Sequence, residues 1–79
     1  MKLNTLGLAH QFVKSHVRPG DLCIDATAGR GNDTALLCEL VGPAGRVIAF
    51  DIQPEALDST RALLETRCLS DRAQLVLDS

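Results

Sequence analysis

Acidic and glycine residues follow two short apolar segments of this chain. Residues 25–34 read Asp-Ala-Thr-Ala-Gly-Arg-Gly-Asn-Asp-Thr, and residues 50–53 read Phe-Asp-Ile-Gln. Gly29 and Asp51 are 22 positions apart. This is close to the spacing at which a carboxylate after a second strand meets the ribose of a nucleotide held by a glycine turn. The two segments therefore predict a binding site for a nucleoside-containing cofactor.

The charges around the glycine turn favour a cationic cofactor over a dinucleotide. Asp33 lies close to where a pyrophosphate would sit, and two anions there would repel each other. Thr34 stands where a dinucleotide-binding pattern usually has its third glycine. Asp25, before the turn, suits the ammonium group of S-adenosylmethionine, which carries a sulfonium and no phosphate. We therefore expect S-adenosylmethionine, with NAD as the alternative cofactor.

The residues after the second apolar segment are expected to hold the nucleoside. Asp51 is expected to accept hydrogen bonds from both ribose hydroxyls, although it could instead cap the helix that follows. Ile52 and Gln53 are expected to flank the adenine, one as an apolar wall and the other as a polar edge. Asp78 or Ser79, near the end of the sequence, could reach the adenine amino group.

The elements that must position these residues alternate along the chain. Hydrophobic periodicity and turn residues predict helices over 5–17, 33–41 and 54–67, and strands over 22–24, 46–50 and 73–77. Asn32 or Asp33 is expected to cap the second helix. Crossovers of this length suit parallel strands. The pattern predicts an α/β fold, the amino-terminal half of a Rossmann-like, doubly wound parallel sheet.

Composition excludes several classes of function. The 79 residues carry a net charge of −2, which argues against a strong electrostatic nucleic-acid binder. No stretch approaches the length of a transmembrane helix. The three cysteines have no metal-ligand spacing, so no metal site is expected. Their odd number, without a signal peptide, fits the reducing cytoplasm.

At its motifs the chain resembles the small bacterial class I methyltransferases known as rRNA methylases. These enzymes are linked to methylation of the aminomethyl group of 5-aminomethyl-2-thiouridine at the tRNA wobble position. The similar stretches are Ala9-His10, Arg18-Pro19-Gly20-Asp21, Asp25-Ala26-Thr27, Gly29-x-Gly31-x-Asp33-Thr34, Phe50-Asp51-Ile52-Gln53 and Asp78-Ser79. Arg30 departs from the family pattern, and its cation is expected to point away from a cationic ligand.

The resemblance implies a set of cofactor contacts and an RNA acceptor, with tRNA the expected partner. The expected contacts are Asp25, Thr27, Gly29, Gly31, Asn32, Asp33, Thr34, Asp51, Ile52, Gln53, Asp78 and Ser79. A full-length member would have about seven strands, so residues 1–79 would form a single partial domain, truncated after its third strand. The groups that receive the base would lie beyond Ser79. No catalytic residue is assigned, and the isolated chain is expected to show no turnover.

Two other interpretations remain open at this point. One is a fragment of an NAD-type oxidoreductase, which would share the glycine turn and the acidic strand end. The other is a non-catalytic truncated module that self-associates, as a homodimer or a larger assembly, because an open sheet edge offers unpaired backbone groups to another chain.

Overall fold

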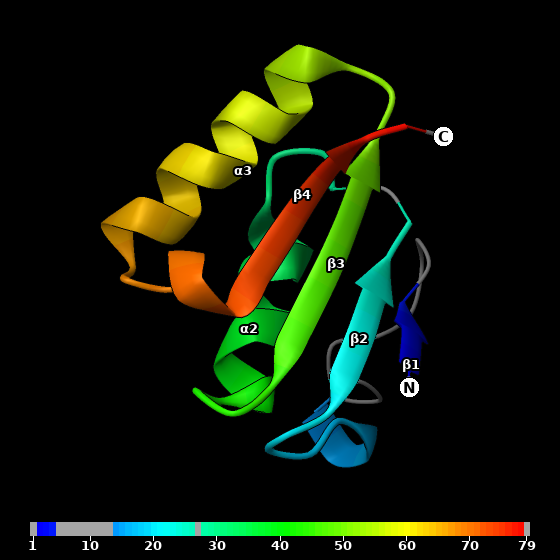
Figure 1. Ribbon diagram of the computed structural model, residues 1–79, viewed down its shortest axis with the longest axis vertical. Helices are drawn as coiled ribbons and strands as arrows, with labels where there is room; N and C mark the ends of the chain where they lie inside the picture. The colour runs from blue at the N-terminus through cyan, green and yellow to red at the C-terminus, as the bar shows by residue number, and fades with distance from the viewer. Residues whose placement is uncertain (1, 5–13, 27, 79) are drawn as a thin grey trace.

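The computed structural model describes residues 2–4, 14–26 and 28–78, which form a parallel sheet packed against two helices (Figure 1). Four strands lie in the order β1-β2-β3-β4, all parallel. Their bounds are β1 Lys2–Asn4, β2 Leu22–Asp25, β3 Arg46–Asp51 and β4 Ala73–Leu77. The helices are α2 Asn32–Val41 and α3 Pro54–Thr66, and a short 3-10 helix, η1 Ser70–Arg72, precedes β4.

The expected α/β parallel fold is confirmed, and most element bounds agree within a residue or two. Strand β1 is the exception, because the sequence predicted no strand before the first helix. Its three residues are too few to show a period of two, and only the pairing with β2 defines them as a strand. Of the helix expected over 5–17, residues 14–16 are helical, and residues 5–13 lie outside the described part of the chain.

Alternation along the strands buries one face of the sheet under both helices. Cys23, Val47 and Ala49 have no exposed surface and point to the helix side. Cys23 and Val47 pack with Leu37 of α2 and Leu64 of α3, and Ala49 packs with Ala28 and Leu57 in a second cluster. The intervening residues Ile24, Ile48, Phe50 and Val76 are half-buried on the opposite face. Aliphatic side chains thus fix α2 and α3 side by side behind the strands (Figure 1).

Neither α2 nor α3 has a side-chain hydrogen bond that caps its first turn. The residue that caps α2 is Gly31, with φ 93°, and no side chain caps it, so the expected cap by Asn32 or Asp33 is wrong. Both of these residues already belong to the first turn of α2. Pro54 occupies the first turn of α3, where its missing N–H costs no hydrogen bond.

Candidate functional site

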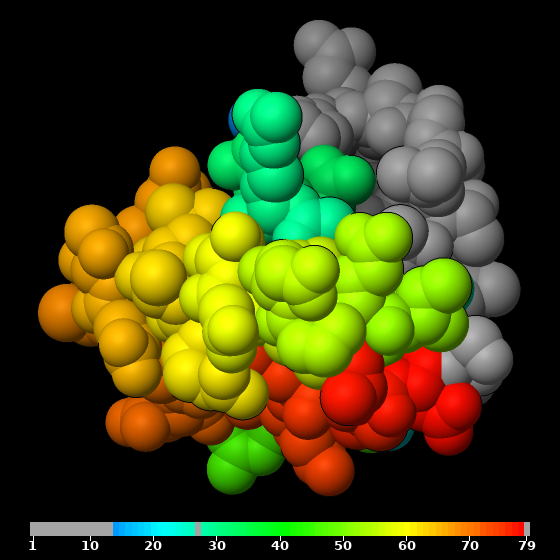
Figure 2. Space-filling model, turned by 90° about the horizontal axis from the view of Figure 1, so that it is seen from above, coloured from blue at the N-terminus to red at the C-terminus, as the bar shows by residue number. Residues whose placement is uncertain are grey.

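The glycine loop, the turn after β3 and the end of β4 come together at the carboxyl ends of the strands. Figure 2 looks onto this end of the sheet and shows the three segments on one surface. Backbone hydrogen bonds join them: the Ala28 N–H donates to the Phe50 carbonyl at 2.9 Å, and the Asp78 N–H donates to the Asp51 carbonyl at 2.9 Å. Parallel strands thus gather residues from three distant parts of the sequence.

Asp51 connects the glycine loop to the start of α3. Its Oδ2 accepts the Gly29 N–H at 3.1 Å, and its Oδ1 accepts the Gln53 N–H at 2.9 Å. The second bond is an Asx turn, in which the side chain of Asp51 closes the turn that leads to Pro54. Hydrogen bonds from the backbone of Gln53 and Gly29 hold the pKa of the Asp51 carboxyl below its ordinary value. Asp51 is therefore a carboxylate at neutral pH, with lone pairs left for further donors.

The two glycines of the loop are needed for different reasons. Both have positive φ, 57° at Gly29 and 93° at Gly31, where a side chain is strained. A Cβ at Gly31 would lie 2.8 Å from the Thr60 Cα of α3, whereas a Cβ at Gly29 would meet no protein atom. Close packing against α3 therefore demands glycine at position 31. Only at Gly29 is there open space that a ligand could share.

Thr60 is a residue of this site that sequence analysis missed. Its hydroxyl donates to the Ala56 carbonyl of α3 at 2.8 Å and lies 3.3 Å from the Gly29 carbonyl. Since these contacts link α3 to the glycine loop, Thr60 helps to hold the carbonyl of Gly29, as Asp51 holds its N–H. No local pattern indicates a contact between residues 31 positions apart.

Asp25 is the last residue of β2 and lies just before the glycine loop. It is only 3% exposed, and its Oδ2 accepts a hydrogen bond from the Thr34 hydroxyl at 2.7 Å. Thr34 is fully buried in the first turn of α2, so this pair ties the end of β2 to that helix. Asp25 can act on a ligand mainly through its negative charge or through water, because so little of its surface is accessible.

The remaining predicted contacts lie around this centre. Ile52 is 66% exposed, and Gln53 and Asp78 are exposed, which leaves them accessible to a ligand. Asn32 and Asp33 lie in the first turn of α2. Arg30 is exposed, as expected of a cation that points into solvent. Thr27 and Ser79 lie outside the described residues.

None of the three cysteines forms a disulfide. Cys23 and Cys38 are buried, and burial raises the pKa of the Cys38 thiol to about 11, so it carries its proton at neutral pH. In the described part of the chain, no group of three or more His, Cys, Asp or Glu residues is placed to hold a metal ion. Nor does any helix there have the length and apolar character needed to cross a membrane.

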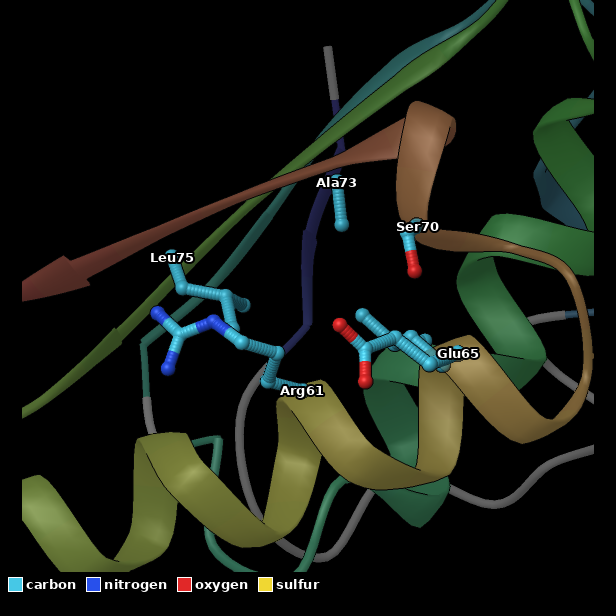
Figure 3. Close-up of a pocket in the computed structure, with 6 residues that line it drawn as sticks. Arg61, Glu65, Ser70, Ala73 and Leu75 are labelled. Carbon is cyan, nitrogen blue, oxygen red and sulfur yellow. The ribbon is translucent and has the colours of Figure 1, made fainter.

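A pocket of about 280 Å³ lies away from these residues, between α3 and the beginning of β4 (Figure 3). Its lining residues are Arg61, Leu64, Glu65, Ser70, Ala73 and Leu75. None of the predicted cofactor contacts belongs to it. The glycine loop and Asp51 define the candidate cofactor site by their hydrogen-bonding groups, and the pocket is a separate feature.

Comparisons with known proteins point to methyltransferases. The chain is 41% identical over 63 residues to the chloroplastic tRNA (mnm(5)s(2)U34)-methyltransferase of Arabidopsis thaliana, an alignment covering 73% of the chain and 23% of the relative. A crystal structure described as a "putative rRNA-methylase" from Clostridium thermocellum matches with a TM-score of 0.89 and 47% identity. That match covers 96% of the chain and 41% of the solved protein. No family model matches the chain.

A further solved relative carries a ligand. SMU.1697c of Streptococcus mutans, described as "a putative methyltransferase" in complex with SAH, matches with a TM-score of 0.80 and 41% identity over 89% of the chain and 38% of that protein. The chain thus spans less than half the length of the solved relatives and about a quarter of the curated one.

Proposed function

We propose that this chain is the S-adenosylmethionine-binding part of an RNA methyltransferase, because its sequence and parallel α/β fold are similar to part of proteins described as RNA methyltransferases and rRNA methylases. Residues 1–79 would form a partial domain whose acceptor-binding groups lie elsewhere. The proposed setting is the cytoplasm, where S-adenosylmethionine and RNA meet and where free cysteines stay reduced.

The observation that carries this proposal is the position of Asp51. Its carboxylate is anchored by backbone N–H groups from both the glycine loop and the turn before α3. Asp51 itself is only 9% exposed, but the residues around it, Ile52, Gln53 and Asp78, are exposed and leave this end of the sheet accessible. A fixed, ionised acceptor at a strand end suits a pair of ribose hydroxyls, because both hydroxyls can donate to one carboxylate.

The neighbouring residues have complementary roles in the proposed site. Gly29 leaves open space beside the backbone for the ligand, and the negative charge of Asp25 favours the methionine ammonium and the sulfonium from beneath the loop. Ile52 and Gln53 provide an apolar and a polar surface for the adenine, and Asp78 an acceptor for its amino group. The bound cofactor supplies an electrophilic methyl group, and these residues bind and orient it.

RNA is the proposed acceptor class, and a modified wobble uridine of tRNA is the specific acceptor we favour. The Arabidopsis relative is named for a tRNA uridine, whereas the Clostridium protein is described as an rRNA methylase. Methyl transfer depends on holding the acceptor in line with the methyl group. No acceptor-binding residue is assigned among the described residues, and we propose that this chain alone binds cofactor without turnover.

Calorimetric titration with S-adenosylhomocysteine and, separately, with NAD tests the proposal. We expect the intact chain to bind S-adenosylhomocysteine and not NAD. Asp51→Asn should weaken binding by about 10- to 100-fold, because charged hydrogen bonds to the ribose contribute that much. Asp58→Asn is the matched control, since Asp58 lies on α3 in an exposed ion pair with Arg61 and should leave affinity unchanged.

Two results would contradict this function. Tight NAD binding without a response to S-adenosylhomocysteine would favour the oxidoreductase interpretation. Equal affinities of the wild-type chain and the Asp51→Asn variant would mean that the ribose is held elsewhere. Circular dichroism of both variants shows whether a lost signal reflects the site or the fold.

A further inference from the structure

Strand β4 forms an edge of the described sheet, and the pocket of Figure 3 opens beside it. Among the described strands, β4 pairs only with β3. Figure 3 shows α3 running along the pocket, with Ala73 and Leu75 of β4 on one side and Arg61 and Glu65 on the other. A helix beside an exposed strand edge is a surface to which another strand can add.

The backbone groups of the outer edge can be assigned from one hydrogen bond. The Asp78 N–H donates to the Asp51 carbonyl, so the backbone of residue 78 points toward β3. Successive residues of a strand direct these groups to opposite sides, and therefore Leu77, Leu75 and Ala73 direct theirs away from β3. The Ala73 N–H is already used, because it donates to the Ser70 carbonyl.

On this edge one large side chain, that of Leu77, projects, and one small side chain, that of Ala73, leaves space. Leu77 is 57% exposed, although it belongs to the same face of β4 as Leu75 and Ala73, which pack against the core. At the other end of the strand, the small side chain of Ala73 leaves room in the pocket. Leu77 thus protrudes on the same face of β4 as the space at Ala73, four positions earlier in the strand.

We propose that two copies of this chain associate through antiparallel pairing of their β4 strands, with the two Leu75 residues opposite each other. In this register Leu77 of each copy faces Ala73 of the other, and its side chain enters the partner's pocket. The outward-pointing groups of Leu75 exchange N–H···O bonds with their symmetry mates, and the Ala73 carbonyl accepts the N–H of the partner's Leu77. The sheets of the two copies then form one continuous sheet, with a two-fold axis between the paired β4 strands.

Charge also favours this orientation. Arg72 precedes β4 and Asp78 follows it. Antiparallel pairing brings Arg72 of one copy toward Asp78 of the other at both ends of the interface, an attraction that the neighbouring Asp71 and the bond from Arg72 to the Cys38 carbonyl reduce. Parallel addition of a second copy would place like charges side by side, which disfavours pairing. The strand itself, Ala-Gln-Leu-Val-Leu, has no charged residue that would oppose a second strand.

Sedimentation velocity over a concentration series up to about 1 mM tests the association, since a short strand interface is expected to be weak. The wild-type chain should dimerise. Leu77→Lys should weaken the dimer by about tenfold or more, because each copy loses a buried leucine. Leu22→Lys is the matched control: Leu22 is 41% exposed but lies in β2, and its replacement should leave the dimer unchanged.

Cross-linking tests the register. In a Cys68→Ser background, the Gln74→Cys and Val76→Cys variants are oxidised separately and as a mixture. Positions 74 and 76 of opposite copies would be a non-hydrogen-bonded pair with Cα atoms about 4.5 Å apart, which suits a disulfide. Identical positions would be about 7–8 Å apart, too far for an easy bridge. We therefore expect the mixed disulfide to form fastest.

A monomer at every concentration, or equal weakening by Leu77→Lys and Leu22→Lys, would overturn the proposal. Faster bridging between identical positions would overturn the register. Neither experiment involves a cofactor, so these outcomes are independent of whether the chain binds S-adenosylmethionine.

Discussion

Asp51 is the residue on which the candidate site depends. Sequence analysis treated its carboxylate as a ligand for ribose, with helix capping as the alternative. In the structure it accepts the N–H of Gln53, close to the expected capping role, and also the N–H of Gly29, 22 positions away. The two roles are compatible, because each carboxylate oxygen has a second lone pair. Asp51 therefore shapes the loop before any ligand arrives.

The lowered pKa of Asp51 predicts a pH dependence of stability. A carboxyl with a lower pKa in the folded state stabilises the fold fully above its unfolded pKa and loses this contribution as pH falls through the folded pKa. We expect the stability difference between wild type and Asp51→Asn to be constant above about pH 5 and to shrink below about pH 4.

Urea unfolding at a series of pH values measures this difference. Asp58→Asn provides the comparison, since Asp58 is exposed and its ion pair with Arg61 should contribute little at any pH. A difference between wild type and Asp51→Asn that stays constant down to about pH 2 would contradict the assignment of the hydrogen bonds to an ionised carboxylate.

Among the elements, α3 ends in a Schellman motif that uses an unfavourable residue. The Leu69 N–H donates to the Leu64 carbonyl at 2.8 Å, and the Cys68 N–H donates to the Glu65 carbonyl at 3.1 Å. Leu64 and Leu69 both lie in the core, which supplies the apolar contact typical of this motif. Cys68, however, has φ 59°, a conformation that glycine adopts more readily.

Cys68→Gly should therefore stabilise the protein. Relief of the left-handed conformation is worth about 1–2 kcal/mol, and the greater freedom of glycine in the unfolded chain offsets about 0.4–1 kcal/mol of it. We expect a net gain of about 0.5–1 kcal/mol in the free energy of unfolding, measured by urea titration. Cys68→Ala keeps the strained φ and should show no comparable gain. A loss of stability in the glycine variant would mean that the thiol makes a contact of its own.

At the scale of the whole molecule, a small chain holds the candidate cofactor site on a limited core. A domain of this size buries only about 60% of the surface of its unfolded chain. Helices α2 and α3 both cover one face of the sheet, whereas Ile24, Ile48, Phe50 and Val76 on the other face are half-buried. Ligand binding should consequently be a large part of the total stability.

Thermal unfolding with S-adenosylhomocysteine measures that contribution. Ligand at a hundredfold excess over its dissociation constant adds about 2.7 kcal/mol. For a chain of this length, each kcal/mol raises Tm by about 4–8 °C, so we expect an increase of about 10–20 °C. NAD at the same concentration should leave Tm unchanged. No change with either ligand would mean that the strand ends of this chain do not form a cofactor site by themselves.

The sequence by itself determined the local elements and the identity of the residues at the strand ends. Helices α2 and α3 and strands β2, β3 and β4 follow from periodicities and turn residues that lie within a few positions of each other. The glycine turn and Asp51 follow from their spacing to those elements. Strand β1 did not, since three residues hold too little pattern to identify a strand.

Only the tertiary structure decided what each of these residues contacts. It assigned Gly31 to packing against Thr60, buried Asp25 against Thr34, and left Leu77 exposed on the strand whose other end lines a pocket. These relations join residues from different elements, and their geometry depends on how the strands and helices pack. Local sequence specifies backbone conformation through short-range sterics and periodic burial, whereas long-range distances exist only after the chain has folded.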